Sequence, residues 1–163
     1  ADDGTSAALF YLFTYTFMVL GSFAIIGAMG ADGEHPLDRY AGLGRSRPVL
    51  AMAFTILLLA QAGVPLTSGF VAKFQVIAAA VGDRSYLLAA VAMLSAVIGA
   101  FMYLRIVMTM YVVDDGTEGP SPTVHWTVAI VLIGIVGFTI LVGIVPQFLI
   151  EFAEDAVLVL IRG

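Results

Sequence analysis

The stretch QAGVPLTSG, residues 61–69, interrupts an apolar block that runs from about Val49 to Val81. As one continuous helix this block would be about 50 Å long, too long for one untilted bilayer crossing and too short for two crossings with a turn. Pro65 cannot donate a backbone hydrogen bond and disfavours helix at the residue before it, while Gly63 and Gly69 add flexibility on either side. We therefore predict one membrane span made of two half-helices joined by an extended link.

The whole chain has the composition of a membrane protein. It has 163 residues, of which 61% are hydrophobic and 12% are charged, and its mean hydropathy is +1.03. A soluble domain is about half apolar and about a quarter charged, so the soluble globular and disordered classes are both excluded. The lack of cysteine excludes iron–sulfur clusters, thiolate zinc sites and cysteine nucleophiles. A formal net charge of −5 argues against a nucleic-acid partner, which requires a basic surface.

Four apolar blocks predict an all-α, polytopic membrane protein in which residues 1–163 form a single transmembrane domain. Each block is long enough to cross a hydrocarbon core of about 30 Å, and the lack of strict alternation favours helices over a membrane barrel. After Pro146, polar and apolar residues separate onto two helical faces, which predicts an amphipathic segment lying in the interface. The predicted elements are spans at about 8–29, 49–81 (broken around 63–69), 86–113 and 124–145, and an interfacial tail at 147–162.

The distribution of arginine predicts the orientation of these spans. The loop at residues 30–48 contains Arg39, Arg45 and Arg47, whereas the turn after the second span contains only Arg84. Short loops rich in Lys and Arg stay in the cytoplasm. We therefore expect loop 30–48 to be cytoplasmic and both termini to lie on the outer side.

Lys73, the only lysine in the chain, follows the break in the second block. A charge inside the bilayer costs at least about 2.5–3.5 kcal/mol on insertion scales and usually marks an ion or proton path. A buried lysine can also lose its proton near neutral pH, which makes Lys73 a candidate proton relay. Gln61, Thr67 and Ser68 are polar neighbours that could hold water beside it. Two alternatives stay open: a proline kink without function, and a lysine that snorkels to the nearby membrane surface.

Thr14 and Tyr15 belong to a weakly polar stripe on the first span, which Tyr11 and Ser22 extend at helical spacing. Such a stripe either lines a hydrated interior or bridges neighbouring helices. We keep Thr14 and Tyr15 as candidates for the wall of a proton path, with both readings open.

Sequence signatures of catalytic chemistry are missing. There is no P-loop, GxGxxG, HExxH or GxSxG pattern, so we expect neither a nucleotide site nor a redox site in this chain. His125 stands beside Trp126 at the start of the fourth span, where an aromatic belt at the membrane surface is expected more than a metal or proton site.

The stretch from Ala41 to Phe74 resembles the proton-conducting, antiporter-like membrane subunits that respiratory NADH:quinone oxidoreductase (complex I) shares with Mrp-type cation/proton antiporters. The broken helix of that family carries a lysine after a G(I/V)P and a GF element. In this sequence the elements are matched by Gly63-Val64-Pro65, Gly69-Phe70 and Lys73. The related subunit M branch has glutamate at the lysine position, so the likeness is closest to the subunit N branch of bacterial complex I. The run from Tyr103 to Met108 and the first span are also similar to that branch.

The resemblance implies a fold and a function that the composition does not. Members of the family are built from two inverted helix repeats, each with a broken helix, and this chain matches their C-terminal spans. It would therefore belong to a proton-pumping, non-redox membrane subunit of a translocase, in which Lys73 relays protons while quinone is reduced elsewhere.

The same resemblance sets expectations for cofactors, partners and place. The chain would bind no cofactor, because NADH, FMN, iron–sulfur clusters and quinone are expected on other subunits. Its partners would be the other membrane subunits of complex I and the lipid bilayer, with no nucleic acid and no small-molecule substrate other than protons. It would lie in the bacterial inner (plasma) membrane. There are two alternatives to a complex I subunit: a subunit of an Mrp-type antiporter, and a purely structural membrane module.

Overall fold

The computed structural model describes residues 2–29, 37–112 and 124–152. Within these residues the regular structure is entirely helical, which confirms the predicted all-α class. Loop residues 30–36, residue 113 at the end of the third predicted span, and residues 153–162 of the predicted tail lie outside the described part. The elements are α1 (Asp2–Met29), the 3₁₀ helix η1 (Leu37–Tyr40), α2 (Leu43–Ser46), α3 (Pro48–Ala62), α4 (Ser68–Gly82), α5 (Tyr86–Val112) and α6 (Trp126–Ile144), and residues 147–152 are again helical.

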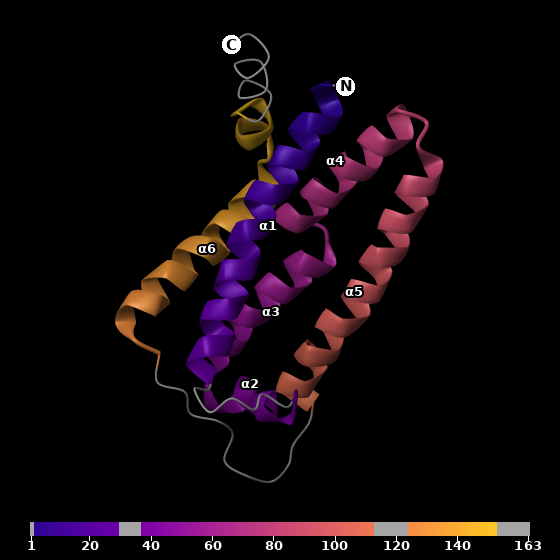
Figure 1. Ribbon diagram of the computed structural model, residues 1–163. Helices are drawn as coiled ribbons and strands as arrows, with labels where there is room; N and C mark the ends of the chain where they lie inside the picture. The colour runs from indigo at the N-terminus through magenta and orange to yellow at the C-terminus, as the bar shows by residue number, and fades with distance from the viewer. Residues whose placement is uncertain (1, 30–36, 113–123, 153–163) are drawn as a thin grey trace.

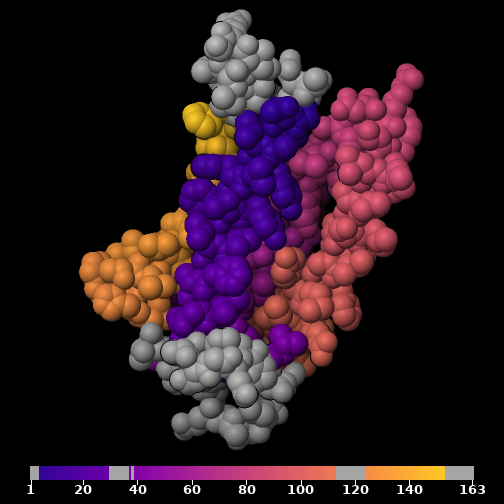
Figure 2. Space-filling view, viewed as in Figure 1, coloured from indigo at the N-terminus to yellow at the C-terminus, as the bar shows by residue number. Residues whose placement is uncertain are grey.

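The long helices form an antiparallel bundle in which α1 is central. In Figure 1, α1 and α5 run in one direction, and α3, α4 and α6 run in the other. α1 contacts α3, α4 and α6, whereas α5 packs along α3 and α4. In Figure 2, α1 covers the front face, with α5 on one side and α6 on the other. α3 and α4 therefore lie between α1 and α5.

The bundle is apolar on its outside as well as in its core. The largest buried cluster joins α1, α3 and α6 through residues such as Ile25, Leu57 and Ile135. Large apolar side chains also cover the outer surface, including Leu87 at 81% exposure and Ile133 at 72%. A water-soluble protein rarely exposes apolar surface on this scale, whereas a lipid environment accommodates it. The chain is an integral membrane protein.

Three helices are long and apolar enough to cross a membrane: Gly4–Met29 within α1, Tyr86–Val112 and Trp126–Ile144. α3 and α4 are apolar but have only 15 residues each. At 1.5 Å per residue each is about 22 Å long, shorter than a hydrocarbon core of about 30 Å. The four-span count therefore depends on whether α3 and α4 share one crossing, which is taken up under Proposed function.

Local backbone geometry explains why α3 ends at Ala62. Gly63 follows it in the left-handed region at φ 89°, which costs glycine little. The N–H of Gly63 donates to the Leu59 and Ala60 carbonyls, and the N–H of Val64 donates to the Leu59 carbonyl. This is the Schellman arrangement that closes helix C-termini. Leu66 also has a positive φ, of 70°, which is unfavourable for a residue with a branched side chain.

The non-helical link is shorter than the predicted break. Ser68 and Gly69 belong to the first turn of α4, so only residues 63–67 lie between the two helices. Glycine is required at position 69 because a Cβ there would collide with the carbonyl oxygen of Ala60. Gly143 on α6 has the same role, since a Cβ there would collide with backbone atoms of Leu66 and Thr67. Two glycines thus bring α4 against the end of α3, and α6 against the link.

Candidate functional site

Lys73 on α4 reaches back across the break to the end of α3. Its half-buried ammonium donates hydrogen bonds to the carbonyl oxygens of Gln61 at 2.6 Å and Ala62 at 3.1 Å. These carbonyls lie at the C-terminus of α3, where the backbone has no helical partner and carries partial negative charge. The side chain passes Gly63, at which a Cβ would come within 3.1 Å of the Lys73 Cδ. The Lys73 ammonium on α4 therefore binds the C-terminal end of α3.

A cavity of about 330 Å³ opens beside Lys73, between α1, α4 and α5. At about 30 Å³ per molecule, its volume corresponds to roughly ten waters. Its polar lining side chains are Lys73, Gln61, Tyr11, Tyr15, Ser95 and Tyr103, and its apolar ones include Val76, Ile77, Ala92 and Ala96. The arrangement places a primary ammonium group and several hydroxyls around one cavity that is large enough for water.

Three of the side chains predicted from the sequence meet here: Lys73, Gln61 and Tyr15. Gln61 also joins α3 to α1. Its buried side-chain amide donates to the Ser22 hydroxyl at 2.7 Å and to the Leu57 carbonyl at 3.3 Å. Gln61 thus positions the carbonyl that Lys73 binds, and its amide already has partners.

The other three predicted wall residues are placed elsewhere. Thr14 is buried, but its hydroxyl donates to the Phe10 and Tyr11 carbonyls of its own helix. The Thr67 hydroxyl donates to the Val64 carbonyl at 2.6 Å and so stabilises the link. Ser68 is fully buried, and its hydroxyl has no hydrogen-bond partner among the residues that the structure describes. None of the three is among the residues that line the cavity beside Lys73.

Tyr11, Ser95 and Tyr103 complete the cavity wall and were not among the predicted site residues. Tyr11 stacks on Tyr15, with ring centroids 5.4 Å apart. Tyr11 could have been found from its place in the polar stripe of α1. Ser95 and Tyr103 are isolated polar groups on α5, and only the packing of α5 against α4 and α3 brings them to Lys73.

Residues 1–99 of the chain match a known protein family, described as "NADH:quinone oxidoreductase/Mrp antiporter, TM". The chain belongs to this family. Its similar relatives include NADH-quinone oxidoreductase subunit N 3 of Streptomyces griseus, 37% identical over 160 residues, covering 96% of this chain and 29% of the relative. Subunit N of a Parafrankia species is 40% identical, covering 94% and 30%, and subunit N of Mycobacterium tuberculosis is 38% identical with the same coverage. The chain thus spans less than a third of the length of these relatives.

The fold of this chain is similar to that of two solved structures. A Mrp complex from a Dietzia species superimposes with a TM-score of 0.84 over 96% of this chain and 38% of the matched chain, at 23% identity. Respiratory complex I from Thermus thermophilus superimposes with a TM-score of 0.80 over 90% and 34%, also at 23% identity. At this identity the superpositions establish the helical fold, and the resemblance to subunit N depends on the sequence comparisons.

No cluster of three or more metal-ligating side chains occurs within residues 2–29, 37–112 and 124–152. The side chain of His125 lies at the start of α6, where its ring nitrogen Nδ1 is 2.8 Å from the Thr127 hydroxyl and accepts from the Thr127 N–H at 3.5 Å. This is the geometry of a helix N-cap. His125 therefore has a local structural role in this family member.

Replacing Ser22 with Ala should lower the free energy of unfolding by about 1–3 kcal/mol, because the buried Gln61 amide loses its acceptor on α1. Thermal denaturation of the detergent-solubilised protein measures the loss. Thr16→Ala on the same helix is the control. The exposed Thr16 hydroxyl donates to the Leu12 carbonyl of its own helix, so this change should stay within about 0.5 kcal/mol. Equal effects of the two substitutions would show that the α1–α3 hydrogen bond contributes nothing.

Proposed function

We propose that this chain is part of a proton-translocating membrane subunit of an NADH:quinone oxidoreductase, and that Lys73 is its proton relay. The observation that supports this most directly is the position of Lys73. Its ammonium binds the C-terminal carbonyls of one half-helix from the other half-helix, and it lines a cavity large enough for water. Ionisable residues are rare in membrane helices and occur mainly where they face interior cavities that carry ions or protons.

We propose further that α3, the link and α4 form one broken crossing. Both helices run in the same direction in Figure 1, between the oppositely directed α1 and α5. With α1, α5 and α6 this gives four spans. A non-helical link at membrane depth is tolerated where protein covers it or water contacts it. Here Gly143 of α6 packs on the link, and the Lys73 cavity lies on the α5 side of the broken helix.

Lys73 can exchange a proton without losing its place in this arrangement. An ammonium group has three N–H donors, and two of them bond to Gln61 and Ala62. Transfer of the third proton to water in the cavity leaves a neutral amine, which still donates two hydrogen bonds. The protonated and neutral forms of Lys73 differ by one positive charge at the end of α3. Charges on neighbouring groups act on that charge, so they would change the proton affinity of Lys73. In this mechanism the tyrosine and serine hydroxyls of the wall orient the water chain.

The remaining features of the proposal concern the setting of the site. This chain holds no redox cofactor; NADH, FMN, iron–sulfur clusters and quinone belong to other subunits. The protein lies in a bacterial inner membrane among the other membrane subunits of the complex, with loop 30–48 in the cytoplasm and both ends of the chain outside. Protons are its only substrate.

The second candidate is a subunit of an Mrp-type cation/proton antiporter, which the structural similarity to the Mrp complex keeps open. The two are separated by isolating the endogenous protein from native membranes in mild detergent and identifying its companions. Co-purification with NADH:quinone reductase activity and a peripheral dehydrogenase arm supports the first proposal. Co-purification with other antiporter subunits, without reductase activity, overturns it.

A further inference from the structure

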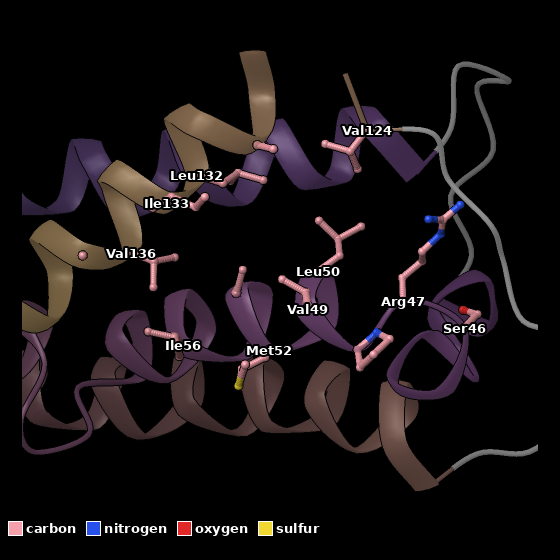
Figure 3. A pocket seen from close by; sticks show the side chains of 14 residues that line it. Ser46, Arg47, Val49, Leu50, Met52, Ile56, Val124, Leu132, Ile133 and Val136 are labelled. Atoms are coloured by element: carbon pink, nitrogen blue, oxygen red, sulfur yellow. The ribbon is translucent and has the colours of Figure 1, made fainter. Parts of the chain in front are cut away.

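A groove on the opposite side of α3 from the Lys73 cavity has the features of a lipid site. It lies between the first half of α3 and α6 and has a volume of about 690 Å³, within the range of about 300–1,000 Å³ typical of small-ligand sites. In Figure 3, side chains of α3 and α6 face each other across it, among them Leu50, Ile56, Leu132 and Val136. The walls are almost wholly apolar.

A cation lies at one end of this groove. Arg47 is exposed, directly precedes α3 and lines the groove together with Ser46 and Pro48. Figure 3 shows Arg47 at the end where α3 begins, with the apolar side chains extending away from it. A helix that starts at a membrane surface places its first residues at headgroup level and its following turns among acyl chains. The groove therefore combines a positive end with a long apolar trough.

We propose that the groove binds one acyl chain of an anionic phospholipid, whose phosphate pairs with Arg47. Basic groups at the membrane surface between transmembrane helices attract anionic headgroups, and the trough would hold the chain beneath. The chemistry of the groove favours such a lipid, because its one cationic side chain lies at one end and its other walls are apolar. An anionic phospholipid has the same two parts, a charged headgroup and an apolar chain.

The test is photolabelling of the intact membrane complex that contains this chain. The probe is phosphatidylglycerol with a photoreactive group near the end of one acyl chain, compared with phosphatidylcholine carrying the same chain. Gly137 lines the groove, and a Cβ there meets no neighbouring atom, so Gly137→Leu fills the groove without displacing backbone. Gly134, on the same helix, is equally open but does not line the groove, and Gly134→Leu is the matched control. Arg47→Gln removes only the charge.

The expected result is phosphatidylglycerol labelling of peptides from the first half of α3 and the facing part of α6. Arg47→Gln should lower it by about fivefold, which corresponds to about 1 kcal/mol for one basic residue near the membrane surface. Gly137→Leu should abolish labelling by either lipid, and Gly134→Leu should leave it unchanged. Equal labelling by both lipids with no effect of Arg47→Gln overturns the proposal, as does cross-linking of the groove to another protein helix. Because no proton transport is measured, the outcome is independent of the role of Lys73.

Discussion

Replacing Lys73 with Met should sharply reduce proton pumping by the assembled complex while leaving assembly nearly intact. Methionine keeps an unbranched side chain of similar length, so the packing beside Gly63 is retained. It removes the only group at this position that can release a proton, and loss of a proton-transfer group typically slows transfer by about 100-fold or more. The measurement is the number of protons translocated per electron in proteoliposomes, alongside the yield of intact complex.

Lys73→Arg separates proton exchange from charge. The guanidinium keeps a positive charge that can bind the carbonyls at the end of α3, but it does not lose its proton in proteins. The arginine variant should therefore assemble as well as the wild type and pump as poorly as the methionine variant. A normal proton-to-electron ratio in Lys73→Met would contradict the relay role. A normal ratio in Lys73→Arg together with a low ratio in Lys73→Met would show that the site requires a positive charge and not proton exchange.

Replacing Gly69 with Ala should destabilise the break by about 2–3 kcal/mol, the largest stability effect that we expect from adding a single methyl group. The new Cβ would collide with the carbonyl oxygen of Ala60, which belongs to the rigid backbone of α3. The first turn of α4 must then move away from α3. Because Lys73 lies one turn further along α4, its two hydrogen bonds to α3 should weaken as well. Thermal denaturation of the solubilised complex and its yield report the change.

Gly27→Ala is the matched control for this substitution. Gly27 is also a glycine within an apolar helix, and a Cβ there comes within 4 Å of no atom of the described residues. Alanine should be neutral or stabilising by up to about 1 kcal/mol, because glycine is the poorer helix former. If Gly69→Ala were as harmless as Gly27→Ala, the close approach of α4 to the end of α3 would not be a feature of the folded protein.

Much of the fold could be predicted because its signals are local. Hydropathy identified the long helices α1, α5 and α6, and Pro65 with Gly63 placed the end of α3. The function of Gly69 was misread. From the sequence it was a source of backbone flexibility in the break, whereas it lies within α4 and is required for a close contact with α3. A contact between two helices leaves no local pattern that separates a packing glycine from a flexible one.

The site could be predicted only in part for a similar reason. Lys73 and Gln61 flank the same break, so their proximity followed from a short stretch of sequence. Thr14 and Tyr15 are adjacent on α1, and a broad polar stripe could not decide which of them faces the cavity. Ser95 comes from α5, far along the chain, and reaches the site only through the packing of helices.

Filling the cavity while leaving Lys73 in place tests most directly whether protons reach the lysine through this space. Gly99 lines the cavity, and a Cβ there would make an ordinary contact of 3.6 Å with Tyr103, so Gly99→Leu should fold and displace water. Val97→Phe adds bulk to an exposed position of the same helix, outside the cavity, and is the control. We expect the number of protons pumped per electron to fall in Gly99→Leu and to stay normal in Val97→Phe. A normal ratio in Gly99→Leu would contradict a water path through this cavity.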